Sequence, residues 1–100
     1  MIKIKVSYDD TIIKNFKITG HANYDIHGKD IVCASVSSIV ITSCNMALTF
    51  DSCAINVKQS EGLIDVEVLK ESDIINKVFI NKINMLKELE IQYKNNVKFI

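Results

Sequence analysis

The alternation of apolar and polar positions at the start of the chain predicts a β-hairpin. Apolar residues recur at every second position through residues 2–8, which is the period of a half-buried strand. Asp9 and Asp10 then favour a turn, and residues 11–19 return as a second strand. We expect the inward-facing positions to be Ile2, Ile4, Val6, Tyr8, Ile12, Phe16 and Ile18.

A second hairpin is predicted in the middle of the chain. Residues 54–59 and 63–69 carry the strand pattern, and Ser60-Glu61-Gly62 between them supplies a turn. The positions expected to face inward are Ile55, Val57, Ile64, Val66 and Val68.

Two helices are predicted, one after each hairpin. Residues 30–50 are apolar almost throughout, and their length and Ala, Met and Leu content favour a helix with Asp30 as its N-cap. Because its apolar positions go nearly all round, we expect this helix to be covered on several sides. Residues 73–95 predict an amphipathic helix with an apolar face of Ile75, Val78, Phe79, Leu86, Leu89 and Tyr93.

The order of these elements is ββαββα, and the closing "VKFI" predicts a short final strand. Strands paired by tight turns, with helices between the pairs, are typical of an α+β fold. We therefore expect an antiparallel sheet from two β-hairpins, packed with one buried and one amphipathic helix. Nothing in residues 1–100 resembles a linker or a repeat, so we expect a single domain.

The charge and hydropathy of the chain indicate which kinds of binding partner can be expected. The chain has 12 lysines, no arginine and 12 acidic residues, so its net charge is zero. Nucleic-acid binders usually carry a basic excess and use arginine, so we expect no nucleic-acid partner. No apolar run approaches the ~18 residues of a membrane span, and the first residues lack the apolar core of a signal peptide. We therefore expect no membrane partner and a cytoplasmic protein with reduced cysteines.

The rarest chemistry of the chain is concentrated in "GHANYDIHGKDIVCASVSS", residues 20–38, which contains both histidines, one of three cysteines and two of three glycines. Cys33 falls in the first turn of the predicted helix, where unpaired N–H groups and the helix dipole favour negative charge. A thiolate is the attacking form of cysteine, and the same N–H groups could stabilise an oxyanion. Cys33 is therefore the candidate nucleophile, and Ser37 lies one turn further on the same face.

His21 is the candidate base for this nucleophile, since a cysteine–histidine pair is the minimum for nucleophilic attack on a carbonyl. It lies where the second strand ends, and Gly20 before it allows a sharp exit from the strand. Asp25 and Asp30 are nearby carboxylates that could orient the imidazole.

Simpler interpretations exist for the other reactive residues. Cys44 and Cys53 are expected to be small packing residues, and His27 is expected to be a solvated loop residue. A zinc site would need His21, His27 and Cys33 with a fourth ligand from Asp25 or a distant cysteine. That spacing matches no usual zinc pattern, so we expect no metal.

The stretch "GHANYDIHGKDIVCASVS" resembles the signature of the ribosomal-processing cysteine proteases (Prp), which read approximately G-H-A, a short loop, and then G-x-D-I-V-C-A-A-V-S. Ser35 stands where the family usually has alanine, a small-for-small change. The "YKNNVKFI" ending is similar to the family's end but lacks its frequent proline. The matching residues are Gly20, His21, Ala22, Gly28, Asp30, Ile31, Val32, Cys33, Ala34, Val36 and Ser37.

This resemblance implies a bacterial cytosolic endopeptidase that needs no cofactor. Its substrate would be the N-terminal extension of large-subunit ribosomal protein twenty-seven, and it would form a homodimer. The family's nucleophile falls on Cys33, its histidine on His21 and its helix serine on Ser37.

The resemblance also implies a mobile loop between His21 and Cys33 that becomes ordered around the substrate. We expect Tyr24 and Ile26 to cover apolar parts of a bound peptide, with Gly28 as a hinge. Two other functions remain open from the sequence: a non-catalytic protein-binding module of the same fold, and a thiol-dependent hydrolase with another substrate.

Overall fold

The computed structural model describes residues 1–100, and its element order is ββαββαβ. Both predicted hairpins, both helices and the short final strand are present, which confirms the predicted α+β fold. The bounds are β1 (Ile2–Asp9), β2 (Ile12–Thr19), α1 (Ile31–Phe50), β3 (Ile55–Ser60), β4 (Leu63–Val68), α2 (Asp73–Gln92) and β5 (Val97–Phe99).

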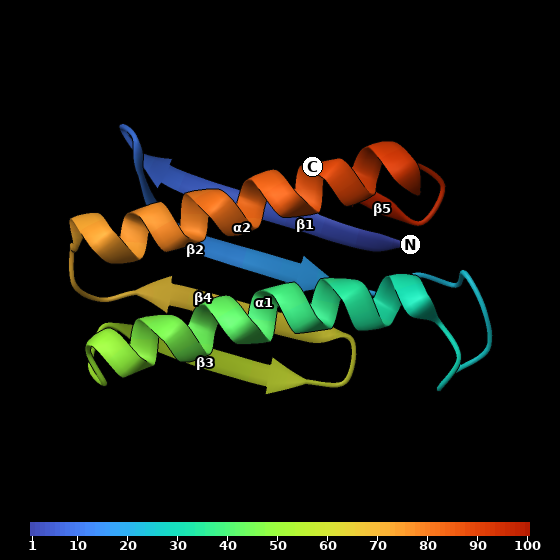
Figure 1. The fold of residues 1–100 in the computed structure, drawn as a ribbon, viewed down its shortest axis with the longest axis horizontal. Coiled ribbons are helices and arrows are strands. Elements are labelled where there is room, and N and C mark those ends of the chain that lie inside the picture. Colours follow the sequence, from blue (N-terminus) through green and yellow to red (C-terminus); the bar gives the residue numbers. More distant parts are fainter.

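The five strands form one sheet in the order β3-β4-β2-β1-β5 (Figure 1). The pairs within and between the two hairpins are antiparallel, as predicted. β5 adds one parallel pair along β1, so the complete sheet is mixed. The parallel pairing follows from α2, which carries the chain back along the sheet before β5 begins.

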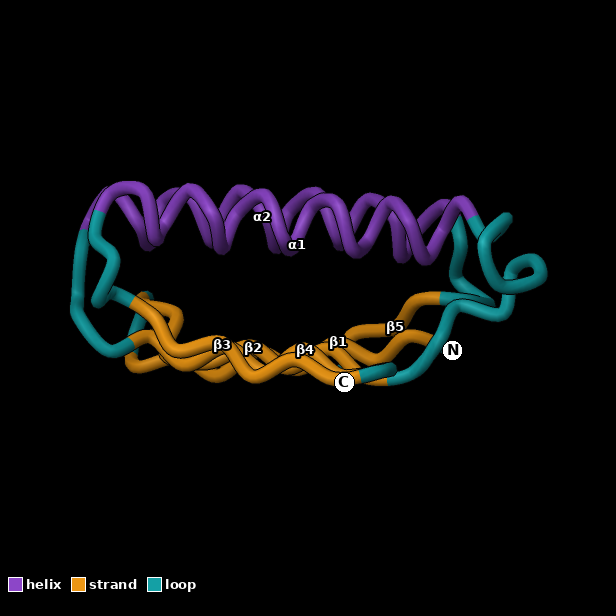
Figure 2. The backbone as a smooth tube through the Cα atoms, turned by 90° about the horizontal axis from the view of Figure 1, so that it is seen from below, coloured by secondary structure: helices purple, strands orange, loops and turns teal.

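The molecule has two layers, with both helices on the same face of the sheet (Figure 2). A cluster of 19 buried apolar residues lies between the layers. At its centre the rings of Phe16 and Phe79 meet edge to face, with centroids 5.2 Å apart. Aromatic pairs prefer this geometry, which joins β2 to α2.

The expectation that α1 is covered on several sides is wrong for this chain on its own. The side of α1 that faces the sheet is buried, but Ile31, Ile41, Met46 and Phe50 on other sides are 42–55% exposed. The reason is that no third layer lies above the helices. α1 is also the one helix long and apolar enough to cross a membrane, which is weak evidence because the core helix of a soluble protein passes the same test.

A β-bulge in the first hairpin changes which residues face the core. The register between β1 and β2 shifts between Ser7 and Tyr8. As a result Ile13, and not the predicted Ile12, is buried at 1% exposure. Tyr8 pairs with Ile13 and keeps its predicted face, but near the end of the hairpin it is 51% exposed. One extra residue in a strand moves every side chain beyond it to the opposite face. Val57 faces inward as expected, since it pairs with the buried Val66, but it is still 37% exposed because β3 is the edge strand of the sheet.

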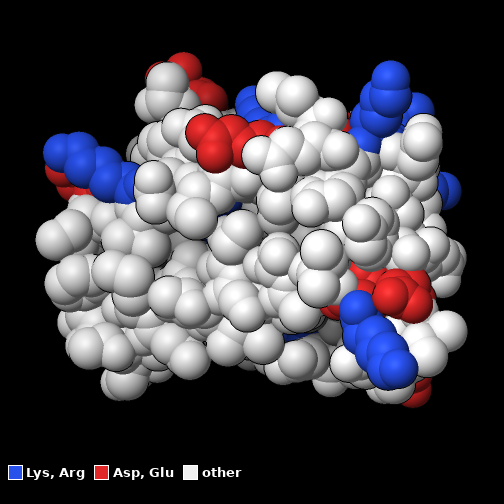
Figure 3. Space-filling view, turned by 45° about the vertical axis from the view of Figure 1, so that its right-hand side comes forward, with Lys and Arg blue, Asp and Glu red and all other residues white.

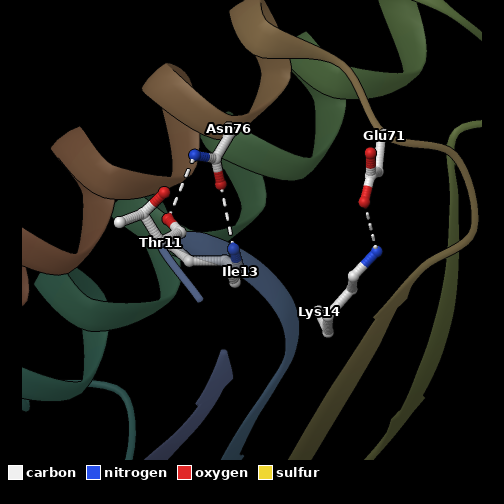
Figure 4. Close-up of polar contacts among 5 residues, drawn as sticks. All are labelled: Thr11, Ile13, Lys14, Glu71 and Asn76. Carbon is white, nitrogen blue, oxygen red and sulfur yellow. Dashed lines mark hydrogen bonds and ion pairs between the residues drawn. The ribbon is translucent and has the colours of Figure 1, made fainter. Parts of the chain in front are cut away.

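The side chain of Asn76 on α2 fastens this bulged segment (Figure 4). Its Oδ1 accepts a hydrogen bond from the N–H of Ile13 at 2.9 Å, and its Nδ2 donates to the carbonyl of Thr11 at 3.4 Å. The bond to Ile13 satisfies a main-chain N–H beside the irregular register, where the ladder is interrupted.

α2 places a lysine in the core, which its amphipathic pattern does not suggest. Lys82 is 1% exposed, and its Nζ has no hydrogen-bond partner. The amine lies 2.6 Å from the ring centroid of Phe16 and 4.4 Å from that of Phe79. Burial lowers the pKa of Lys82 to about 6, with Cys44 acting weakly in the opposite direction. The amine is therefore mostly neutral at pH 7.

The topology gathers four segments at one end of the molecule, on the right of Figure 1. The end of β2, the loop that follows it, the start of α1 and the β3–β4 turn all lie there. β2 and β4 are neighbours, and Thr19 pairs with Leu63 at this end. The β3–β4 turn is thereby brought beside the histidine–cysteine stretch.

Candidate active site

Asp30 organises the start of α1 and the loop before it. One oxygen of its carboxylate accepts hydrogen bonds from the N–H groups of Val32 and Cys33, at 3.0 and 2.9 Å. The other accepts from the N–H groups of Tyr24 and Asp25, at 2.9 and 3.3 Å. The predicted N-cap is therefore confirmed, and the same side chain closes the loop onto the helix.

These hydrogen bonds determine the charge of Asp30. Burial by itself would raise the pKa of the Asp30 carboxyl, but the four N–H donors outweigh it and hold the pKa below its usual range. Asp30 is therefore ionised at neutral pH. All its donors are main-chain groups, so the carboxylate orients the loop and the helix start and not the imidazole.

The same hydrogen bonds occupy the N–H groups that were expected to stabilise an oxyanion at the start of α1. The N–H groups of Val32 and Cys33 are taken by the Asp30 side chain, and that of Ala34 donates to the Asp30 carbonyl at 3.1 Å. The helix dipole still favours negative charge at this end. A developing oxyanion would need other donors than these three N–H groups.

Cys33 is a partly buried free thiol in the first turn of α1. Cys44 is buried, as expected of a packing residue, and burial raises the pKa of its thiol. Cys53 was also expected to be a packing residue, but it is exposed because it lies in the turn after α1. Cys33 is thus the cysteine that lines the same cavities as a histidine.

His21 lies two residues after the end of β2, and the β3–β4 turn supports it. Gly20 has a φ of +85°, and a side chain there would collide with the main chain of Met1. The N–H of Gly20 donates to the carbonyl of Gly62 at 2.9 Å. A Cβ placed on Gly62 would lie 3.3 Å from Nε2 of His21, so the imidazole rests against the space that this glycine leaves open.

Two cavities meet at Cys33, His21 and Ser37. The larger, about 520 Å³, has mostly polar and charged residues in its wall, including Asp25, His27, Asp30 and Glu61, together with Gly28. The smaller, about 160 Å³, is half hydrophobic and extends under the β3–β4 hairpin, with Gly20 in its wall. Only these three residues belong to both cavities. The structure thus brings together the two predicted catalytic residues and the predicted helix serine.

Ser37 is the serine of α1 that lines both cavities, and its hydroxyl makes no hydrogen bond within the protein. The hydroxyls of Ser35 and Ser43 donate to main-chain carbonyls of their own helix, at 2.7 and 2.8 Å. Ser37 makes no such bond and faces both cavities. It is available to a substrate.

The loop of residues 20–30 differs from expectation in where its apolar side chains lie. The ring of Tyr24 meets that of Tyr93 at the end of α2, with centroids 5.4 Å apart. Asn96 donates to the carbonyl of Ala22 at 2.9 Å. Neither Tyr24 nor Ile26 borders the cavities at Cys33, whereas Gly28 does. The base of the loop is therefore fastened to the domain, while Ile26 at its tip is 64% exposed.

Sequence reasoning missed two contributors to this site. His27, expected to be merely solvated, borders the larger cavity, and so does Glu61 of the β3–β4 turn. Nothing local marks Glu61, which reads as an ordinary turn residue. The alternative of a zinc site finds no support in the geometry, because no three or more His, Cys, Asp or Glu side chains are arranged to hold a metal ion.

The protein is an α+β domain in which a thiol at the start of a helix and an imidazole line the same cavity. These features are typical of the thiol hydrolases, and they make the protein a candidate member of that class. Comparison with known proteins is more specific. The family model described as "Cysteine protease Prp" matches residues 1–98, so the chain belongs to the Prp cysteine protease family.

Individual relatives agree with this assignment. The ribosomal processing cysteine protease Prp of Bacillus subtilis (strain 168) is 42% identical over 45 residues, which cover 45% of this chain and 39% of that protein. An essential ribosomal processing protease Prp from S. aureus, crystallised with a covalently linked product peptide, has a TM-score of 0.93 at 21% identity, covering 99% of this chain and 97% of that one. The S. aureus protein with a substrate peptide has a TM-score of 0.87 at 20% identity, with coverage of 100% and 98%. At these identities the structural matches show a shared fold.

Proposed function

We propose that this protein is a cysteine endopeptidase that removes the N-terminal extension of large-subunit ribosomal protein twenty-seven. The observation that carries the proposal is that Cys33 and His21, 12 positions apart in sequence, border the same two cavities. Membership of the Prp family supports the reaction class, and the peptide complexes of the S. aureus protein support a peptide as the substrate.

The proposed mechanism uses the groups at the junction of the cavities. The Cys33 thiolate attacks the carbonyl carbon of the scissile bond, and His21 takes the thiol proton and returns it to the leaving amine. Water then hydrolyses the acyl-enzyme and regenerates the thiol. Ser37 would donate a hydrogen bond to the substrate, and its place in the wall of both cavities supports this role.

The test is cleavage of the ribosomal protein with its extension, followed by mass spectrometry of the products. We expect the wild-type protein to release the extension peptide and Cys33→Ala to release none, because loss of a nucleophile removes most of the catalysis. Cys53→Ala is the matched control, since this thiol is exposed and borders neither cavity. Binding without cleavage by the wild-type protein would favour the non-catalytic module instead.

We further propose a homodimer, formed through the outward side of the helices. α1 contains no charged residue, and its exposed Met46 borders a shallow cavity together with the exposed Met85 of α2. Ile41 and Phe50 are further exposed apolar residues of α1. Figure 3 shows a broad uncharged area with charged side chains around its margins. Large exposed apolar areas usually mark protein contacts. Sedimentation of Met46→Glu should show monomers, whereas Ile91→Glu, at an isolated exposed position, should sediment as the wild type does.

We expect this enzyme to act in the cytoplasm without nucleic-acid or membrane partners. Its zero net charge and lack of arginine support this expectation. α1 is used as one layer of the domain, with its inner side in the core.

A further inference from the structure

The turn between α2 and β5 lies at the same end of the molecule as the loop that follows β2, on the right of Figure 1. It contacts this loop at two points. The ring of Tyr93 meets that of Tyr24, and the side chain of Asn96 donates a hydrogen bond to the carbonyl of Ala22 at 2.9 Å. Ala22 comes directly after His21, so the second contact lies next to the candidate base.

Asn96 is itself held by main-chain hydrogen bonds, so its side chain is a fixed donor. Its N–H donates to the carbonyl of Tyr93 at 2.8 Å, and its carbonyl accepts from the N–H of Ile2 at 2.8 Å. Ile2 begins β1, and Val97 directly after Asn96 begins β5. The half-buried Asn96 therefore reaches Ala22 from the body of the domain.

The main chain around His21 is fastened on both sides. Before it, the N–H of Gly20 donates to the carbonyl of Gly62 at 2.9 Å. After it, the carbonyl of Ala22 accepts from Asn96, and the Ala22 side chain is buried at 1% exposure. His21 itself is exposed, so these two points determine where its imidazole stands against Gly62.

Small displacements of this main chain matter for the proposed reaction. A tilt of the peptide group at His21 moves the imidazole relative to the Cys33 sulfur. A misplacement of about 1 Å can lower a catalysed rate about 100-fold, even when its cause lies away from the reacting atoms. Asn96 lines neither cavity at Cys33, so it can act on the reaction through His21 and not by touching the substrate.

We propose that Asn96 is a positioning residue for His21. By fixing the carbonyl of Ala22, it keeps the imidazole in place beside the cavities at Cys33. The asparagine and the alanine are 74 positions apart, so no local pattern of the sequence indicates this role. The inference rests on the proposed role of His21 as the base, and it adds a residue from outside the histidine–cysteine stretch.

Two variants at Asn96 separate the hydrogen bond from simple packing. Asn96→Ala removes the whole amide, whereas Asn96→Asp keeps its shape and loses the donor, because an ionised carboxylate can only accept. The assay is cleavage of the ribosomal protein with its extension. We expect both variants to lower kcat at least about tenfold and to leave KM within about twofold of the wild-type value, since a misplaced base slows the chemistry and leaves binding intact.

Asn76→Ala is the matched control. The side chain of Asn76 also binds the main chain of a distant segment, with its Oδ1 2.9 Å from the nitrogen of Ile13. It lies near the start of α2, whereas Asn96 follows the end of this helix. Asn76→Ala should lower the melting temperature and leave kcat unchanged. If it lowers kcat as much as Asn96→Ala does, the effect comes from stability and the positioning role is refuted.

Nuclear magnetic resonance tests the position of the imidazole directly. The chain has two histidines, so comparison with His21→Ala assigns the ring protons of His21. In the wild-type protein this ring should show nuclear Overhauser contacts to the Hα protons of Gly62, because a Cβ on Gly62 would lie 3.3 Å from Nε2 of His21. The contacts should weaken in both Asn96 variants and persist in Asn76→Ala.

The activity of His21→Ala distinguishes two kinds of failure. If the wild-type protein cleaves nothing, or if His21→Ala cleaves at the wild-type rate, the proposed mechanism fails and the positioning role with it. If His21→Ala is inactive but both Asn96 variants keep the wild-type kcat and the Overhauser contacts, the positioning role alone is refuted. A change in only one of these two measurements would also refute it, because kcat and the place of the ring must then be independent.

Discussion

Replacing Lys82 by methionine should stabilise the protein and flatten the dependence of its stability on pH. Lys82 is 1% exposed, has no hydrogen-bond partner, and lies between two aromatic rings. Burial lowers its pKa from 10.5 to about 6. Methionine has a similar length and carries no proton to lose, so it removes the cost of burying the amine while filling the same space.

The magnitude follows from the two pKa values. In the unfolded chain the amine stays protonated up to about pH 10.5, whereas in the folded protein it loses its proton above about pH 6. Between these limits the unfolded state binds more protons, so the free energy of unfolding rises with pH by up to about 1.4 kcal/mol per pH unit. The full interval corresponds to about 6 kcal/mol, and about 5 kcal/mol of this penalty remains at pH 7. Total stabilities are only about 5–15 kcal/mol.

Urea unfolding measured between pH 6 and 9 is the assay. The wild-type free energy of unfolding should rise by about 4 kcal/mol more than that of Lys82→Met over this range. At pH 7 the midpoint of Lys82→Met should be higher by about 2–5 M urea, for a slope of 1–3 kcal/mol per M. Lys87→Met, at an exposed lysine of the same helix, is the control and should follow the wild-type curve. Parallel curves for the wild-type protein and Lys82→Met would refute the reasoning.

Three further outcomes are expected around the candidate active site. His21→Ala should lose nearly all cleavage and His27→Ala should keep most of it, because only His21 borders both cavities with Cys33; the reverse pattern in a peptide-cleavage assay would reassign the base. Asp30→Ala should lower the free energy of unfolding by about 0.5–2 kcal/mol, because the helix loses its N-cap. Since the pKa of the Asp30 carboxyl is lowered in the folded protein, the difference in stability between the wild-type protein and this variant should be present at neutral pH and should disappear as the pH falls well below 4. In residues 22–29, hydrogen exchange should be slow for the amides at the base of the loop that bind Asp30 and fast for the amides at its tip. The exchange at the tip should slow when a peptide saturates the Cys33→Ala variant. Protection of the tip in the unliganded protein would contradict a closing loop.

Much of the architecture follows from local pattern. The alternation in the first strand, the turn residues between strands and the apolar run after Asp30 each carry enough short-range information to place an element. The N-cap role of Asp30 is of this kind, since it depends on residues two and three positions away. The proximity of His21 to Cys33 was inferred from their place around one loop, and the shared cavities agree with it.

Errors arose where burial depends on distant packing. The bulge at Ser7–Tyr8 moved Ile13 into the core because Asn76 and the register of β2 support it there. The exposed side of α1 could not be recognised from composition, since an apolar helix looks the same whether its cover is its own chain or another molecule. Tyr24 was assigned to a substrate, but the end of α2 supplies a ring for it to pack on.

The sequence by itself determined the elements of this protein and the concentration of a histidine, a cysteine and two glycines around one loop, because those depend on neighbours along the chain. The tertiary structure alone decided that the β3–β4 turn supports His21, that Glu61 joins the larger cavity, and that a second, smaller cavity opens beside Cys33. These features come from the pairing of β2 with β4, which brings Thr19 next to Leu63 across 44 positions of sequence. Such a pairing is selected by the packing of the whole core, and no local stretch of residues encodes it.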